Sequence, residues 1–418
     1  MHIRHQVEQS FKKKQNCAAE KVAFISPVIP PYPAGVSIIV ERLIKAWPKN
    51  RYCLVGTEPI SAAEIAQNKL EYPCFYLETT SRTYQQKKSI IFKFFKKIGR
   101  IVFAPVRFYK LCTRLSQIIC KEGVTQLVYC TGDLLALPVC YHLSKKYQIP
   151  LIFYVFDDYI NQWPYPILRN AIKLIEKRCI QQVTQIITTN ELLSLAYFER
   201  YKVLPKIIHN GIDEGTSVIK GKGLLIDNTS NKPIKLVYTG SIYYAHYDVF
   251  LALVKFLNTT QRKVELHIYT SQEQYVLKNK GLISDLIFFH DYVAQDKVSQ
   301  VLQNADLLFL PLSFNKKYQK IVETAAPCKM AEYLASGTPL LSIVPEFSFV
   351  SWYLKNHQCG IVISDCSSLA IEKKFQYLET HQEEIKQYCS NAFMRMQVDF
   401  SFNAMQAKLF KTLASGAD

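Results

Sequence analysis

The sequence contains no apolar run of the roughly 18 residues that a membrane-spanning helix needs. Its N-terminal segment carries basic side chains but lacks the apolar stretch of a signal peptide. We therefore interpret residues 1–20 as a loose polar tail. Together these two absences predict a cytoplasmic protein.

Paired cysteines are also missing. The twelve cysteines are scattered, with no C-x-x-C pair and no Cys/His cluster at metal-ligand spacing. This pattern argues against a disulfide framework and against a zinc site. Cys130, Cys140 and Cys179 lie in apolar contexts, which is typical of reduced thiols buried as small hydrophobic residues.

Acidic residues are absent from one long segment. The chain has a net charge of +17, and eleven Lys and Arg but no Asp or Glu lie between Thr79 and Lys121. This imbalance favours anionic partners, namely nucleotide phosphates, anionic lipid or nucleic acid. Nucleic acid is the poorest of the three, because no recognised binding motif is present and bulky aliphatic residues interrupt the basic stretch.

Short apolar strands alternate with helices in two series. The first series predicts strands at residues 22–26, 51–56, 126–130, 150–156 and 185–189, and helices that include 36–47, 134–147 and 165–182. The second predicts strands at residues 234–238, 264–269, 286–289, 307–310 and 339–344. Near-continuous apolar strands between helices are typical of parallel sheets covered on both faces.

A polar segment rich in Gly, Asn and Ser separates the two series. We therefore predict an α/β protein of two Rossmann-like, doubly wound domains, at residues 21–208 and 233–395, joined by a linker at 209–232. We expect the domains to face each other across a cleft. Ligands of open α/β sheets bind beyond the carboxyl ends of the strands.

Six motifs follow one another along the chain: Pro30–Gly35 (PPYPAG), Asn210–Asp213 (NGID), Val237–Gly240 (VYTG), Ala305–Pro311, Pro327–Leu341 (PCKMAEYLASGTPLL) and Phe400–Phe402. In sequence and in order they resemble the motifs of the group 1 (family 4) glycosyltransferases, which have the GT-B fold. The resemblance implies an N-terminal acceptor domain and a C-terminal nucleotide-sugar domain. It also implies that a terminal helix, within residues 396–418, crosses back to the first domain.

The resemblance places the donor in the second domain. It implies that Glu332 accepts hydrogen bonds from the ribose hydroxyls; the alternative is a solvated glutamate on a helix. Pro327 suits the first turn of a helix whose free N–H groups can cradle phosphate. Lys329 adds a cation there, or is an exposed helix lysine. Gly240 and Cys328 complete the predicted donor-binding set, together with Ser241.

The chain departs from the family at three positions. Ser241 and His246 stand where many members have an Arg and a Lys that touch the diphosphate, and Thr324 stands where they have an acid. We predict that His246 takes part in catalysis by hydrogen-bonding phosphate, the alternative being a loop-lining residue.

In the first domain, Asp157 and Asp158 follow a predicted strand. Either could orient the acceptor hydroxyl or accept its proton, and the alternative is a strand-end aspartate that caps the next helix. The pair is not a D-x-D motif, so we predict no metal. Gly35 lets the first loop approach a ligand, or simply allows a tight turn.

An amphipathic pattern spans residues 91–103, with Lys93, Lys96, Lys97 and Arg100 on its basic side. Its apolar face either packs on the first domain or contacts the anionic inner leaflet of the membrane. Lipid-linked acceptors are common for related enzymes, so we favour peripheral membrane contact.

These features predict a hexosyltransferase-like enzyme that moves a sugar from a nucleotide-sugar donor to a glycan or lipid-linked acceptor, in surface polysaccharide biosynthesis. We expect no cofactor, and the resemblance favours retention of the anomeric configuration. The alternative is a catalytically silent GT-B protein that binds nucleotide sugar or scaffolds partner enzymes.

Overall fold

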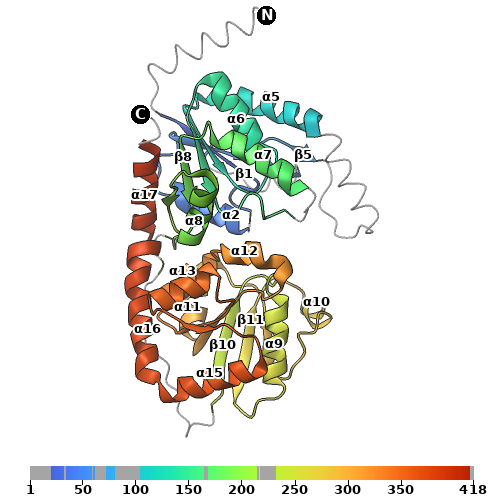
Figure 1. Cartoon of the computed structure of the whole chain (residues 1–418), viewed down its shortest axis with the longest axis vertical. Coiled ribbons are helices and arrows are strands. Elements are labelled where there is room, and N and C mark those ends of the chain that lie inside the picture. The colour runs from blue at the N-terminus through green and yellow to red at the C-terminus, as the bar shows by residue number, and fades with distance from the viewer. Residues whose placement is uncertain are drawn as a thin grey trace, which may run out of the picture. The chain divides into compact units, whose positions relative to one another are not determined.

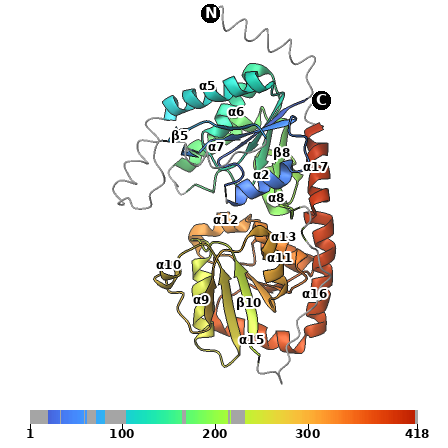
Figure 2. The same ribbon diagram turned by 180° about the vertical axis from the view of Figure 1, so that it is seen from behind.

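The structure of the chain is a computed structural model that describes residues 20–32, 34–58, 60–61, 72–80, 104–163, 168–213, 216 and 232–414. The chain forms two compact units. Unit 1 comprises residues 1–189, 193–208 and 406–418, and unit 2 comprises residues 190–192 and 209–405. Each unit contains a parallel sheet with helices on its two faces (Figures 1 and 2).

Unit 1 is built on a seven-stranded sheet in the order β4-β2-β1-β6-β7-β8-β9. Its strands are β1 (Val22–Ser26), β2 (Tyr52–Gly56), β4 (Cys74–Tyr76), β6 (Gln126–Cys130), β7 (Leu151–Val155), β8 (Gln185–Thr188) and β9 (Lys206–Ile207). A separate pair is formed by β3 (Ile60–Ser61) and β5 (Thr79–Thr80). The central strands are buried along their whole length, as their continuous apolar sequences predict.

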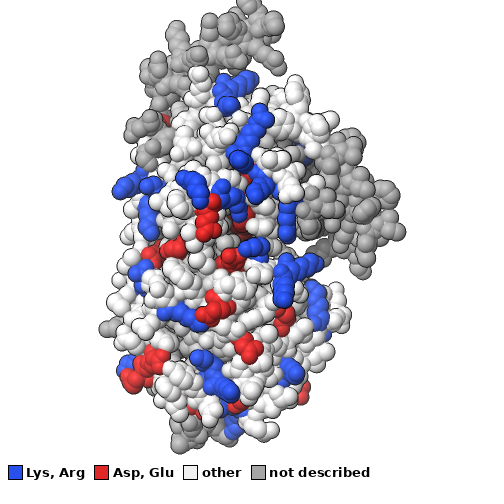
Figure 3. Space-filling model, viewed as in Figure 1, with Lys and Arg blue, Asp and Glu red and all other residues white. Residues whose placement is uncertain are grey.

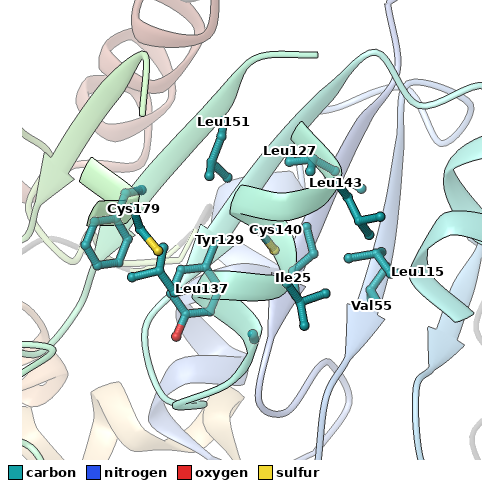
Figure 4. Packing of buried hydrophobic residues seen from close by; sticks show 14 of the residues in the cluster. Ile25, Val55, Leu115, Leu127, Tyr129, Leu137, Cys140, Leu143, Leu151 and Cys179 are labelled. Carbon is teal, nitrogen blue, oxygen red and sulfur yellow. The ribbon is translucent and has the colours of Figure 1, made fainter. Parts of the chain in front are cut away.

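Helices cover both faces of this sheet. They are α2 (Gly35–Ile44), α5 (Ala104–Glu122), α6 (Ala136–Tyr147), α7 (Arg169–Ile180), α8 (Glu191–Tyr201) and the end of α17 (Phe402–Ala414). Ile25 of β1 packs with residues of α5, α6 and α7, and Cys140 and Cys179 lie in the same core (Figure 4). The neighbouring Phe24 points to the other face, where it contacts Trp47, and Trp47 stacks on Phe410 of α17.

Unit 2 is built on a six-stranded sheet in the order β12-β11-β10-β13-β14-β15. The strands are β10 (Ile234–Thr239), β11 (Val264–Tyr269), β12 (Ile287–His290), β13 (Leu307–Pro311), β14 (Leu340–Ile343) and β15 (Ile361–Ile363). The α-helices are α9 (Tyr247–Leu257), α10 (Gln274–Lys278), α11 (Gln295–Gln303), α12 (Gln319–Glu323), α13 (Cys328–Ala335), α14 (Phe349–Asn356), α15 (Ser368–Thr380) and α16 (Gln382–Arg395). A 3₁₀ turn, η2 (Lys316–Tyr318), precedes α12, and a π-helical turn, η3 (Met396–Phe400), joins α16 to α17.

Successive residues of the strands in unit 2 point to different cores. Leu236 and Tyr238 of β10 pack in the core shared with α9 and α15, whereas Val237 packs in the core shared with α13 and α14. This alternation follows from the two-residue period of a strand. The two parallel sheets confirm the predicted α/β, doubly wound class.

The segment that follows residue 208 is already part of unit 2. His209 and Asn210, which begin the predicted linker, are buried, and the backbone N–H of Ile212 donates to the carbonyl of Phe400 at 2.8 Å. The end of α17 is anchored in unit 1, where Gln406 Nε2 donates to the carbonyls of Arg42 and Leu43. No helix among the described residues has the length and apolar character that a membrane crossing requires.

Candidate functional site

The carboxyl end of β10 is shaped by a glycine. Gly240 has a φ of +102°, a value that glycine adopts without strain, and its N–H donates to the carbonyl of Tyr269 at 2.8 Å. A Cβ atom at this position would lie 3.4 Å from Lys329 Nζ. Gly240 thus leaves room for the ammonium group of Lys329 beside the strand end.

Lys329 is held at this strand end by Tyr238. Its Nζ donates to the Tyr238 hydroxyl at 2.8 Å and lies 4.1 Å from the centre of the Tyr238 ring. Burial lowers the pKa of Lys329 to about 8, against the opposing effect of the nearby Glu332. The group is therefore a poorly solvated cation, which is the kind that gains most from an anionic ligand.

His246 lies against the same tyrosine. Its side chain is 3% exposed, and Nδ1 lies 3.3 Å from the Tyr238 hydroxyl. The ring also contacts Tyr243, with centroids 3.9 Å apart. Burial, and then the charge of Lys329, hold the pKa of His246 well below 6.5. His246 is therefore neutral and occupies the position before the first turn of α9.

The Tyr238 hydroxyl connects three of the predicted residues. It donates to the carbonyl of Ser241 at 2.7 Å, accepts from Lys329 and lies beside His246. Ser241 itself is exposed. Sequence reasoning missed Tyr238, although its position in the VYTG motif, two residues before Gly240, was a usable signal.

Helix α13 begins beside the same strand end. The N–H and hydroxyl of Thr239 lie 3.0 and 3.2 Å from the hydroxyl of Tyr333, which ties α13 to β10. Pro327 occupies the N-cap and no side chain caps the helix. The first N–H groups of a helix point outward along its axis, and the helix dipole favours a negative charge there.

The predicted donor residues of α13 lie on its first turns. Cys328 is the first residue of the helix and Glu332 is four residues later, so the two lie on one side of it. Both are partly exposed. Thr324, where the family has an acid, is buried, and its carbonyl accepts from Asn190 Nδ2 at 2.9 Å.

The two aspartates of unit 1 have different environments. Asp158 is 5% exposed, accepts from the N–H of Ile160 at 2.9 Å and pairs with Arg200 at 2.6 Å. These contacts favour the structural alternative for Asp158. Asp157 is exposed, but enough protein surrounds its carboxyl group that desolvation, followed by the charge of Asp158, raises its pKa.

Gly35 is the exposed first residue of α2, in the connection that follows the carboxyl end of β1.

The four basic residues predicted to contact a membrane, Lys93, Lys96, Lys97 and Arg100, lie outside the described residues. Of the basic residues that follow them, Arg107 pairs with Glu78 and Asp133 within unit 1. Figure 3 shows basic side chains spread over one face of the molecule and interspersed with acidic ones.

The described part of the chain contains no group of three or more His, Cys, Asp and Glu side chains arranged to hold a metal ion.

Known proteins resemble the chain in fold and, over one unit, in sequence. Residues 233–378 match the family model described as "Glycosyl transferases group 1". No curated protein sequence matches the chain.

Three solved structures illustrate the likeness in fold. HepE from Anabaena, in complex with UDP-glucose, is 13% identical with a TM-score of 0.63, covering 95% of this chain and 100% of HepE. Sucrose-phosphate synthase from Thermosynechococcus elongatus is 13% identical with a TM-score of 0.64, covering 95% and 98%. A glycosyltransferase from Rickettsia africae is 12% identical with a TM-score of 0.61, covering 96% and 99%.

The two parallel sheets and these structural likenesses define a protein of the GT-B glycosyltransferase fold. Within its second unit, residues 233–378 are similar to the group 1 glycosyltransferases. The resemblance predicted from the sequence motifs is thereby confirmed.

Proposed function

We propose that the chain transfers a sugar from a nucleotide diphosphate donor, which binds at the carboxyl edge of the unit 2 sheet. The observation that carries this proposal is the position of Lys329. Its partly buried ammonium group lies at the end of β10, beside Gly240 and in the first turn of α13.

Departure of the nucleotide diphosphate builds negative charge on its leaving oxygen. A preorganised cation and helix N–H groups in a poorly solvated site stabilise such charge without reorganising. A bound diphosphate would also raise the pKa of Lys329 above its value of about 8, which keeps the ammonium group charged.

Glu332 and Cys328 lie one helical turn apart on α13. We propose that Glu332 accepts hydrogen bonds from the ribose hydroxyls and that Cys328 and Ser241 contact the donor beside it. His246 is neutral and buried against Tyr238, so its contribution is to hold the loop from Gly240 to His246 and to offer at most a neutral hydrogen bond.

For the acceptor side, we propose a glycan or a lipid-linked sugar, with Asp157 as the residue that receives or orients the hydroxyl proton. Asp157 suits this role better than Asp158, because Asp158 is fully engaged with Arg200 and the turn that follows. Retention of configuration, metal independence and a place in surface polysaccharide synthesis belong to the same proposal. So does peripheral membrane contact through Lys93, Lys96, Lys97 and Arg100, which flotation with anionic vesicles tests.

The second candidate is a catalytically silent protein that binds nucleotide sugar or scaffolds partner enzymes. The neutral His246 and the exposed Ser241, which stand where many relatives have two cations, favour it. Turnover assays with UDP-, GDP- and dTDP-sugars separate the two candidates. HepE was solved with UDP-glucose, so UDP-sugars are the first donors to test. Release of free nucleotide supports the enzyme, whereas binding without release supports the silent protein.

A further inference from the structure

A pocket lies in unit 2, away from the proposed donor site. It has a volume of about 210 Å³ and lies beside β15, with walls from the end of α14, from α15 and from α16. Strands β13 and β14 separate β15 from β10, a distance of three strand spacings or roughly 14 Å. The pocket is therefore distinct from the Lys329 site.

Two lysines line this pocket, and none of its lining residues is acidic. Lys355 donates to Glu346 and to Ser364 Oγ, the latter at 3.4 Å, and neither of these partners lines the pocket. Lys374 forms no ion pair with any described residue, and its Nζ lies 4.8 Å from the centre of the Tyr377 ring.

The environment of Lys374 is unfavourable for an isolated cation. Burial lowers its pKa, Glu384 opposes this effect, and the nearby charge of Lys355 lowers the pKa further. A partly desolvated ammonium group that shares a pocket with another cation is stabilised by an anion between them.

Two tyrosine rings also line the pocket. The hydroxyls of Tyr377 and Tyr388 both donate to Glu384, which fixes the two rings and leaves Glu384 outside the lining. Ile361 and Val362 of the edge strand β15 add apolar surface. The pocket thus offers a charged side next to a flat, apolar side.

We propose that this pocket binds a small phosphate monoester, with its phosphate on Lys355 and Lys374 and its carbon skeleton against Tyr377 and Tyr388. Two ammonium groups suit a dianion better than a single carboxylate. Pockets for drug-sized ligands measure about 300–1,000 Å³, so a pocket of about 210 Å³ is too small to enclose a whole nucleotide sugar. The ligand is smaller, of the size of a triose or hexose phosphate.

Isothermal titration calorimetry on the full chain tests the proposal, with inorganic phosphate, glycerol 3-phosphate and glycerol as ligands. Saturating UDP is present throughout, and the titrations are repeated on Lys329→Met. Glycerol 3-phosphate should bind with a stoichiometry of one and more tightly than inorganic phosphate, and glycerol should not bind. Binding that survives in Lys329→Met places the ligand outside the donor site, whether or not the proposed donor function holds.

Variants then locate the ligand. Lys374→Met and Lys355→Met should each weaken glycerol 3-phosphate binding about tenfold, the effect of losing one charge-assisted hydrogen bond. Lys373→Met is the matched control, because Lys373 is exposed on the same helix and does not line the pocket. Circular dichroism verifies folding of each variant. Absence of binding to the wild-type chain, or equal weakening by the Lys373 variant, overturns the proposal.

Discussion

The ammonium group of Lys329 lies over the ring of Tyr238, 4.1 Å from its centre, and donates to the hydroxyl of the same residue at 2.8 Å. The contact joins the first turn of α13 to the end of β10, across 91 positions of sequence. It places one cation at the carboxyl edge of the sheet, where we propose that the nucleotide diphosphate binds, and five of the six predictions below depend on this site.

Replacing Lys329 by Met should lower donor affinity and kcat/KM by about tenfold to a hundredfold. A hydrogen bond to a charged group contributes about 1.5–3 kcal/mol, and the methionine keeps most of the apolar stem. Nucleotide-release kinetics and calorimetry with UDP measure the effect. Lys320→Met is the control, since Lys320 is 63% exposed and pairs with Glu323 on the surface. A Lys329 variant with wild-type kinetics argues against the proposed donor site.

Donor binding by the wild-type chain should weaken as the pH rises through about 8, the lowered pKa of Lys329. The ammonium group is charged below this value and loses its proton above it, so the favourable charge is present on the acid side. A pH profile of kcat/KM measures this limb, which Lys329→Met should lack. An alkaline limb of equal size in the variant would assign the titration to another group.

The lowered pKa of Lys329 should make the free energy of unfolding rise with pH, whereas donor affinity falls. Between about pH 8 and 10.5 the unfolded chain holds a proton at Lys329 that the folded chain has lost. The contribution of this residue to the free energy of unfolding should therefore increase as the pH rises through that window. Urea unfolding of the wild type and of Lys329→Met at pH 7.5 and 10 measures this change. An equal change in the free energy of unfolding between the two pH values in both proteins would contradict the prediction.

Gly240→Ala should lower both stability and donor affinity. The φ of +102° strains any residue with a Cβ atom, by about 1–3 kcal/mol, and the new atom would contact Lys329 Nζ. Gly123→Ala is the matched control, because Gly123 has a φ of +65° and open space around it. Thermal unfolding should show a loss in both variants, and only Gly240→Ala should also weaken UDP binding. Equal UDP affinity of the two variants would show that Gly240 does not contribute to the donor site.

Glu332→Ala should remove discrimination between UDP and 2′-deoxy-UDP. A carboxylate that accepts from the ribose hydroxyls favours the ribonucleotide, and the alanine variant has no such acceptor. Competition of the two nucleotides against a UDP-sugar measures the ratio of inhibition constants. A ratio that is unchanged by the substitution would place Glu332 away from the ribose.

Asp157→Asn and Asp158→Asn should affect different properties. Asp158 is buried against Arg200, so its substitution should destabilise unit 1 by about 1.5–3 kcal/mol, the contribution of a hydrogen bond to a charged group, while Arg200 keeps its ion pair with Glu176. The exposed Asp157 should instead affect turnover with little change in stability. Urea unfolding and turnover per folded molecule are the two measurements. A turnover defect confined to Asp158→Asn would reverse the assignment.

The sequence predicted the strands well where apolar residues run without interruption, as in Val22–Ser26 and Ile234–Thr239. It did not predict β15, whose three residues are too short for a periodic pattern. The helix predicted at residues 36–47 ends at Ile44. Hydrophobic periodicity shows that a helix is present but does not fix its last turn.

The candidate site was partly predictable for a related reason. Local motifs identified Gly240, Lys329 and Glu332, since each motif lies within one strand end or one helix turn. The role of Tyr238 depends on a residue 91 positions away, and that of Asp158 on Arg200, 42 positions away. Contacts at such separations are set by tertiary packing, which no local pattern records.

A crystal structure of the chain with bound UDP is the decisive test of the proposed donor site. We expect diphosphate oxygens within hydrogen-bonding distance of Lys329 Nζ and of the first N–H groups of α13, with the ribose hydroxyls at Glu332. A UDP molecule bound elsewhere, with Lys329 still held only by Tyr238, would contradict it.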